Sequence, residues 1–278
     1  MRQRNILLQH FSAIVLAGAL SAAWGHDPQA RYLGNAGVMV SAGSEKIVFD
    51  AFFDVDYGQY LLVAPETRAA LIADQPPYDG LAAAFVSHVH GDHFSTAPML
   101  AFVAANPKVR VFAPQQVVDA LRRESDDPAL LSHVVGFDLE PGDEPARLRA
   151  GSMDIAAVAI PHAGGQRNAD IQNLFFAVRI ADRASVLHMG DAGPDPNEFE
   201  RQRAFFEAWR FDLIFPPYWF FADETGRFLL ARFFATAQPV GVHVPERAGA
   251  DPTGWRRALD ADLFIEPGET RLIGQGAP

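Results

Sequence analysis

Cysteine is absent from this chain of 278 residues. Its absence excludes disulfide bonds, thiolate catalysis and lipid attachment through a cysteine. Basic residues are also scarce, since 23 lysines and arginines stand against 34 acidic residues and the net charge is −11. A chain this acidic, with no basic patch to offset the charge, is not expected to bind nucleic acid or an anionic membrane surface as its main partner.

The sequence also lacks a Gly-x-Ser-x-Gly motif, which excludes the nucleophilic serine that this motif presents. No Gly/Ser-rich linker and no block of like charge divides the chain. The 26–278 segment is long enough for one large core, so we expect it to form a single domain. The sequence carries no signal for an oligomeric state.

An apolar run of about twenty residues, the length that spans a bilayer, is missing too. The largely apolar stretch Ile6–Leu20 is shorter, follows Arg2 and Arg4, and precedes the small residues of Ser21–Gly25. This order is typical of a secretory signal peptide. We expect residues 1–25 to be removed on export, which predicts a periplasmic or secreted protein with no stable membrane insertion after cleavage. Cleavage two residues earlier and an uncleaved anchor are the alternatives.

Short apolar runs alternate with helix-like segments along the rest of the chain. The runs predicted as strands are Val38–Ser41, Lys46–Asp50, Ala82–Ser87, Val109–Ala113, Asp154–Ile160, Leu174–Ile180, Ser185–Met189, Leu213–Phe215 and Val240–Val244. The segments predicted as helices are Pro65–Ala73, Ala97–Ala105, Gln115–Arg123, Asn197–Trp209 and Arg227–Phe234. This alternation indicates a layered α/β protein and, by itself, leaves a doubly wound sheet open.

Three histidines and an aspartate lie close together in one turn, after an apolar run that ends at Val86. The run is predicted to be a buried strand, so these side chains are expected in the loop at its carboxyl end, where α/β proteins usually place their active sites. Imidazole is a good ligand for zinc, iron or manganese. His88 and His90 can turn toward one ion, whereas Asp92 and His93, beyond a glycine turn, are better placed for a second.

The spacing His88-x-His90-x-Asp92-His93 resembles the signature of the metallo-β-lactamase fold superfamily of binuclear metallohydrolases. Three later residues, each at the end of a strand-like run, stand where that superfamily places its remaining ligands. The resemblance implies a four-layer αββα sandwich, with two sheets face to face and helices outside. It also implies two divalent metal ions, zinc in the first place and manganese or iron as alternatives. The implied ligands are His88, His90 and His162 for one ion, Asp92, His93 and His243 for the other, and Asp191 as a bridge.

Two further residues are expected to support these ligands. Asp50 ends a predicted strand and resembles the superfamily's early aspartate, which holds the ligands without binding metal. An ordinary turn residue is the alternative. His188 lies three residues before Asp191, so we interpret it as a hydrogen-bond partner of a ligand, with the filling of a polar gap at the strand's edge as the alternative.

Four consecutive aromatic residues, Tyr218, Trp219, Phe220 and Phe221, follow a predicted strand. Such a loop is costly to leave in water, so the four residues either pack into the core or line the substrate pocket. If they line the pocket, the substrate has an apolar part. The hydroxyl of Tyr218 could then donate a hydrogen bond to a developing oxyanion.

The ligand set predicts hydrolysis of a small molecule. Two cations that share a water lower its pKa and polarise the bond under attack. Asp92 is the predicted catalytic residue, because a ligand beside this hydroxide can orient it or move its proton. In the superfamily, a bridging aspartate such as Asp191 is typical of thioesterases, lactonases and phosphodiesterases. We therefore predict an exported metal-dependent hydrolase that acts on an ester, a lactone or a phosphodiester with an apolar portion.

Other functions remain open at this point. The segment Tyr32–Val40 resembles the branch that contains the ascorbate-phosphate lactonase and the N-acylphosphatidylethanolamine phospholipase D-like enzymes, although that branch usually has histidine where Asn35 stands. Hydrolysis of β-lactams is the alternative enzyme activity, and members with that activity typically lack the bridging aspartate. A mononuclear iron oxidoreductase such as a persulfide dioxygenase, or a non-catalytic metal-binding protein, is the alternative from a different class.

Overall fold

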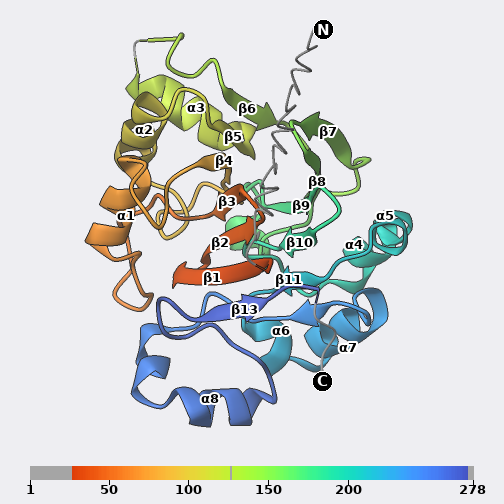
Figure 1. Cartoon of the computed structure of the whole chain (residues 1–278). Helices are drawn as coiled ribbons and strands as arrows, with labels where there is room; N and C mark the ends of the chain where they lie inside the picture. Colours follow the sequence, from red (N-terminus) through yellow and green to blue (C-terminus); the bar gives the residue numbers. More distant parts are fainter. Residues whose placement is uncertain (1–26, 126, 275–278) are drawn as a thin grey trace, which may run out of the picture.

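Two β-sheets face each other in the computed structural model, which describes residues 27–125 and 127–274 (Figure 1). The expected signal peptide at residues 1–25 lies outside the described residues. Within the described part of the chain, no helix is both long and apolar enough to cross a membrane.

The first sheet has seven strands. In spatial order they are β13 (Thr270–Leu272), β1 (Gln29–Gly34), β2 (Gly37–Ala42), β3 (Glu45–Phe49), β4 (Leu81–Phe85), β5 (Arg110–Pro114) and β6 (Val134–Phe137). The strands β13, β1, β2 and β3 pair antiparallel, and β3 to β6 pair parallel. The carboxyl ends of β3 and β4 therefore lie at the same edge of this sheet.

The second sheet has six strands. In spatial order they are β12 (Gln238–Pro239), β11 (Leu213–Phe215), β10 (Ala184–His188), β9 (Leu174–Ile180), β8 (Met153–Ala159) and β7 (Ala146–Ala150). The strands β7 to β10 form an antiparallel meander, whereas β10, β11 and β12 are parallel.

Helices cover the outer face of each sheet (Figure 1). The first sheet is covered by α1 (Pro65–Ile72), α2 (Thr96–Ala105) and α3 (Gln115–Glu124). The second is covered by α4 (Pro196–Arg201), α5 (Arg203–Ala208), α6 (Trp219–Ala222), α7 (Glu224–Phe233) and α8 (Pro252–Leu259). Two short 3-10 helices, η1 (Gly165–Asn168) and η2 (Glu246–Ala250), lie in loops.

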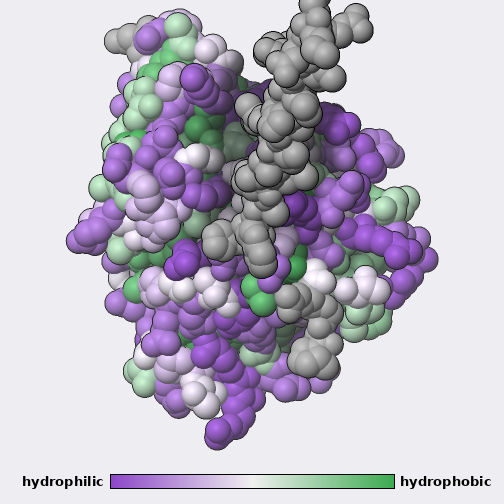
Figure 2. Space-filling model, in the orientation of Figure 1, coloured by the Kyte–Doolittle hydropathy of each residue, from purple (hydrophilic) through white to green (hydrophobic). Residues whose placement is uncertain are grey.

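Three apolar clusters separate these layers. One lies between the sheets and includes Phe49 and Phe176, and each of the others lies between a sheet and its helices, around Phe102 and around Phe199. On the face shown in Figure 2, hydrophilic residues predominate, and hydrophobic ones show mainly between elements. Three cores between four layers confirm the predicted αββα sandwich and exclude the doubly wound sheet.

Local sequence explains where several helices begin. A proline stands at the first helical position of α1, α4 and α8, where its missing N–H costs no hydrogen bond. The side chains of Asp195, Asp223 and Asp251 accept hydrogen bonds from the first-turn amides of α4, α7 and α8.

Two predicted elements differ in the structure. The segment predicted as the strand Val240–Val244 runs beside β11, but its ladder ends at β12 because the opposite residues, Pro216 and Pro217, have no N–H to donate. The helix predicted at Asn197–Trp209 is divided into α4 and α5 at Gln202, whose side chain donates a hydrogen bond to a distant backbone carbonyl. The short strands β1, β6, β7 and β13 and the helices α6 and α8 are not anticipated by the sequence patterns.

Of the four aromatic residues at 218–221, Trp219, Phe220 and Phe221 lie in the short helix α6, and Tyr218 directly precedes it. Phe220 is 0% exposed and Phe221 is 6% exposed, and both belong to the cluster between the second sheet and its helices. Core packing therefore holds for these two residues, and their expected role in substrate binding is wrong.

Phe220→Ala should lower the free energy of unfolding by about 3–5 kcal/mol, because it removes a fully buried ring and leaves a cavity. Phe228→Ala is the matched control, since Phe228 is 58% exposed; its effect should stay within about 0.5 kcal/mol. Urea denaturation of both variants measures the difference. Equal losses would show that Phe220 contributes no more to the core than a surface residue.

Candidate metal centre

Loops from both sheets meet at one edge of the sandwich. The loop after β4 brings His88, His90, Asp92 and His93; the other predicted ligands lie after β8, β10 and β12. All seven predicted ligands form two groups in which the ligand atoms lie within 4.8 Å of one another. The structure thus brings together the residues that the sequence selected.

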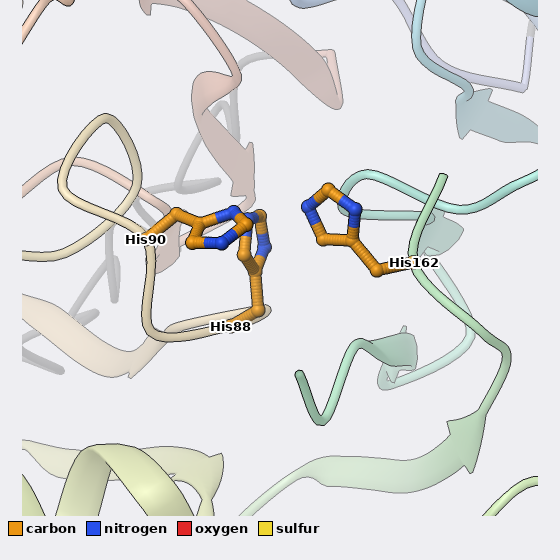
Figure 3. A group of neighbouring side chains, drawn as sticks. All are labelled: His88, His90 and His162. Atoms are coloured by element: carbon orange, nitrogen blue, oxygen red, sulfur yellow. The ribbon is translucent and has the colours of Figure 1, made fainter. Parts of the chain in front are cut away.

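The first group consists of His88, His90 and His162. Their ring centroids are 4.6 to 4.9 Å apart, and the rings of His88 and His90 face that of His162 across a small gap (Figure 3). His88 is fully buried, while His90 and His162 are partly buried at the cavity wall. Three imidazoles with no carboxylate of their own form a set of neutral nitrogen ligands.

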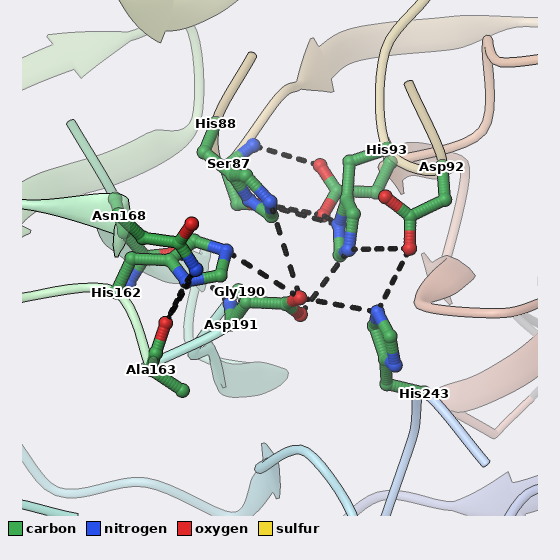
Figure 4. Close-up of polar contacts among 12 residues, drawn as sticks. Ser87, His88, Asp92, His93, His162, Ala163, Asn168, Gly190, Asp191 and His243 are labelled. Atoms are coloured by element: carbon green, nitrogen blue, oxygen red, sulfur yellow. Dashed lines mark hydrogen bonds and ion pairs between the residues drawn. The ribbon is translucent and has the colours of Figure 1, made fainter. Parts of the chain in front are cut away.

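The second group consists of Asp92, His93, Asp191 and His243, all buried. Asp191 lies at its centre: its carboxylate oxygens are 3.1 Å from Nε2 of His93 and 3.1 Å from Nε2 of His243 (Figure 4). The Nε2 atom of His243 is also 3.0 Å from Asp92. Asp191 also approaches the first group, at 3.6 Å from His162 and 4.0 Å from His88. Its position between the groups is that of a bridging ligand.

The other ring nitrogen of three of these histidines is held by the protein. The Nδ1 atoms of His88, His93 and His162 donate hydrogen bonds to Ser87 Oγ (2.9 Å), Asp50 (2.7 Å) and the Ala163 carbonyl (2.6 Å). The Nε2 atoms of His88 and His162 are buried and lack a hydrogen-bond partner in the described structure, whereas that of His93 faces the Asp191 carboxylate. Metal-binding histidines are commonly oriented in this way, because a hydrogen bond from one ring nitrogen leaves the other nitrogen available to the metal. The donor set therefore fits two divalent cations.

The histidines of the two groups differ in the direction of their pKa shifts. Burial lowers the pKa of His88, His90 and His162, so these ligands stay neutral. Burial also lowers the pKa of His243, but Asp191 and Asp92 outweigh it and raise this pKa to about 9. The same two carboxylates raise the pKa of His93. Protons on these two imidazoles offset the buried carboxylates, and a bound cation would take their place.

Asp50 holds one residue of each group through hydrogen bonds. Its carboxylate accepts hydrogen bonds from the Ser87 amide (2.7 Å), from Ser87 Oγ (2.6 Å) and from His93 Nδ1. Ser87 in turn accepts the hydrogen bond of His88. One buried carboxylate thus orients a ligand of each group.

His188 touches no ligand side chain through a hydrogen bond. Its Nε2 donates to the Ala36 carbonyl at 2.9 Å, and its Nδ1 accepts from the Gly190 amide at 3.2 Å. The ring also stacks on Phe49. The interaction with Gly190 fixes the turn before Asp191, where a side chain in place of Gly190 would clash with Asn173. His188 therefore positions backbone and fills the strand's edge, which corrects its expected direct bond to a ligand.

The sequence patterns missed Asn35. This residue is 0% exposed in the turn between β1 and β2. Its side-chain amide donates to the Asp92 carbonyl at 2.9 Å and to the Asp92 carboxylate at 3.3 Å. The backbone carbonyl of Asn35 accepts a hydrogen bond from the backbone amide of His243 at 2.9 Å. The departure from the histidine of the resembled branch was the signal available in the sequence, and it marks a residue that holds two ligand loops.

A cavity of about 530 Å³ opens onto both groups. Its lining includes His90, Asp92, His162 and Asp191, together with the residues Tyr57, Gln59, Tyr60, Ala163, Gly164, Arg167, Asn168 and Trp219. Of the four aromatic residues predicted to bind substrate, Trp219 lines this cavity. Tyr218 does not: it packs edge-on against Trp219 and Trp255. Tyr60, which the sequence analysis also missed, lies edge-on to His243 with ring centroids 4.2 Å apart.

Comparisons with known proteins agree with this arrangement. The sequence profile of the beta-lactamase superfamily domain matches residues 45–241, which include six of the seven predicted ligands and end two residues before His243. No curated protein matches the sequence of this chain.

Solved structures share the fold at low sequence identity. A possible metal-dependent hydrolase from Veillonella parvula has a TM-score of 0.60 and 14% identity, with 88% of this chain and 99% of that one covered. An isothiocyanate hydrolase from Delia radicum gut bacteria has a TM-score of 0.57 and 13% identity, covering 87% of this chain and 98% of that one. CmlA, a diiron beta-hydroxylase from Streptomyces venezuelae, has a TM-score of 0.52 and 14% identity, covering 88% of this chain and 54% of that one.

Two of these structural neighbours are named as hydrolases, and the cluster of histidines and aspartates in this chain indicates a binuclear metal site. Because the profile match spans more than half of the sequence, this chain belongs to the beta-lactamase superfamily.

Proposed function

We propose that this protein is a metal-dependent hydrolase that cleaves an ester, a lactone or a phosphodiester. The observation that carries this proposal is the convergence of seven predicted ligand side chains, four of which line one open cavity. Concave sites with converging polar groups are where small-molecule chemistry takes place. The cavity is also large enough for a small-molecule substrate.

We assign the residues of the two groups as the ligands of two divalent cations. His88, His90 and His162 would hold one ion, and Asp92, His93 and His243 the other, with Asp191 shared between them. Zinc is the proposed metal because imidazole and carboxylate ligands suit it, with manganese and iron as alternatives. When bound, such ions polarise a carbonyl or phosphoryl oxygen and lower the pKa of water.

Residues of the chain supply the remaining functions. Burial raises the pKa of Asp92, but the attraction of His93 and His243 outweighs it and lowers this pKa, so the carboxylate stays ionised and can orient a water molecule by accepting its hydrogen bond. Burial, with Asp191 and Asp92 nearby, raises the pKa of Tyr60 above its usual value. Tyr60 thus keeps its proton and can donate a hydrogen bond in the cavity, the role once expected of Tyr218.

The shared carboxylate also bears on the type of bond. In the resembled superfamily, an aspartate in the place of Asp191 is typical of thioesterases, lactonases and phosphodiesterases. Asp191 is buried and lies between the two ligand groups. We therefore place ester, lactone and phosphodiester hydrolysis ahead of β-lactam hydrolysis.

We further propose that the protein is exported. Arg2, Arg4 and the apolar stretch Ile6–Leu20 have the order of a signal peptide. Removal of residues 1–25 would leave the 26–278 segment as a single domain with this fold, in the periplasm or outside the cell.

The first test is the metal content of the protein, measured by mass spectrometry together with hydrolysis of lactone, thioester, phosphodiester and β-lactam substrates. We expect two zinc or manganese ions per chain and turnover of one of the first three substrate types. His90→Ala should lose one ion and reduce hydrolysis by more than about 100-fold, since even the outer partners of metal ligands are worth 10- to 100-fold.

His133→Ala is the control, because His133 lies outside the ligand groups. Two bound ions with turnover of the β-lactam alone would favour the alternative enzyme activity. A single iron with oxygen uptake and no hydrolysis would contradict the proposal and indicate an oxidoreductase. Tight metal binding without any turnover would indicate a binding protein.

Asn35→Gly tests whether the buried amide holds Asp92 for metal binding. Asn35 has a φ of 46°, so glycine removes the amide without straining the backbone. We expect the dissociation constant for zinc to rise by about 10- to 100-fold, measured by competition with a chelator of known affinity.

Asn106→Gly is the matched control, because Asn106 is also buried and donates hydrogen bonds to the backbone carbonyls of Ile72 in α1 and Phe102 in α2. It should lower the unfolding temperature and leave zinc affinity unchanged. Wild-type zinc affinity in Asn35→Gly would show that Asp92 needs no such support.

A further inference from the structure

One basic side chain lines the cavity besides the histidines: Arg167. It is exposed, and it forms no hydrogen bond or ion pair with any residue that the structure describes. The acidic residues of the lining are Asp92 and Asp191, and both belong to the metal-ligand groups. The guanidinium is thus free to bind a ligand that enters the cavity.

The loop that carries Arg167 is held in place next to the predicted metal ligand His162. His162 is followed by the turn at Gly164 and Gly165, whose φ angles of 98° and 60° suit glycine, and η1 then turns back toward the cavity. Asn168 closes this loop by donating to the Ala163 carbonyl at 2.7 Å (Figure 4). The guanidinium itself lies close to Gly164. This loop therefore holds Arg167 at the rim of the cavity.

The other rim residues favour an anion as well. Gln59, Asn168, Tyr57 and Tyr60 contribute amide and phenol groups that can donate hydrogen bonds, and no carboxylate outside the ligand groups lines the cavity. Two divalent cations would more than offset the charges of the two ligand carboxylates. The cavity would then attract anions within a chain whose net charge is −11.

We propose that Arg167 forms an anion-binding subsite, so that the substrate carries a carboxylate or phosphate group in addition to the bond that is cleaved. This inference rests on the proposed hydrolase function and narrows its substrate class to anionic esters. A guanidinium recognises such groups through two parallel hydrogen bonds, which a single ammonium cannot reproduce. The indole of Trp219 on the same cavity wall would contact the apolar part of the substrate.

Two esters of equal acyl length test the subsite. 4-Nitrophenyl hemisuccinate differs from 4-nitrophenyl butyrate by a carboxylate in place of a methyl group. After subtraction of the spontaneous rate, the zinc-loaded protein should have a higher kcat/KM for the hemisuccinate. Arg167→Gln should lower this preference by about 10- to 100-fold, mainly through KM, because a hydrogen bond to a charged group is lost. Arg167→Lys should retain part of it.

Arg149→Gln is the matched control, since Arg149 is an exposed arginine on β7 outside the cavity and the substitution changes the net charge equally. It should keep the wild-type preference. Hydrolysis of both esters with the same preference in Arg167→Gln and wild type would overturn the subsite while leaving the hydrolase in place.

Calorimetric titration tests the subsite without turnover. Succinate and inorganic phosphate serve as probes, and they distinguish a carboxylate subsite from a phosphate subsite. One of them should bind the zinc-loaded protein at least about tenfold more tightly than it binds Arg167→Gln. Equal binding of both probes to the two proteins would refute the inference. Arg167-dependent binding without hydrolysis of any ester would uphold the subsite and refute the hydrolase.

Discussion

The Asp191 carboxylate, buried among imidazoles from both sheets, is the interaction on which the rest of this structure depends. It lies 3.1 Å from two histidine nitrogens and within 4.0 Å of two more. A buried charge is costly unless cations or protons offset it. Here Asp191 and Asp92 raise the pKa values of His93 and His243, so these imidazoles favour the protonated form that offsets the buried charge. The fold makes this compensation possible, because the loops at one edge of its two sheets bring several histidines to the Asp191 carboxylate.

Holding those loops requires backbone conformations that most residues avoid. Asn35, Asp50 and His243 all have positive φ angles, between 43° and 61°, and all three lie at the metal centre. Such conformations cost about 1–3 kcal/mol each and persist where surrounding contacts fix them. Asp50 has three hydrogen bonds to its carboxylate, and Asn35 bonds to both Asp92 and the His243 backbone. The strain at this edge is therefore balanced by the same hydrogen bonds that aim the ligands.

The sequence predicted the ligand groups better than their surroundings. Histidines and aspartates at the ends of apolar runs are visible in a linear pattern, and strand ends meet at one edge of a sheet. Asn35 could not be assigned this way, because its side-chain amide meets Asp92, 57 residues further along the chain, only in the folded protein. The aromatic run was ambiguous for a similar reason: in a helix, Trp219 faces the cavity while Phe220 turns into the core. The strand expected at Val240 was limited by Pro216 and Pro217 on its neighbour, which composition alone does not place opposite it.

The net negative charge of the chain disfavours an anionic substrate, whereas the positive charge proposed in the cavity favours one. The distance over which each charge acts determines which effect is larger. Exposed acidic residues act over a Debye length of about 8 Å at physiological ionic strength, so most of the net charge of −11 is screened at the cavity floor. The local field there would come from the two proposed cations and from Arg167. A neutral apolar substrate would use the Trp219 wall and leave the guanidinium solvated but idle. An anionic ester with an apolar part would contact both Trp219 and Arg167. Such a substrate therefore explains why an indole and a guanidinium lie on the same cavity.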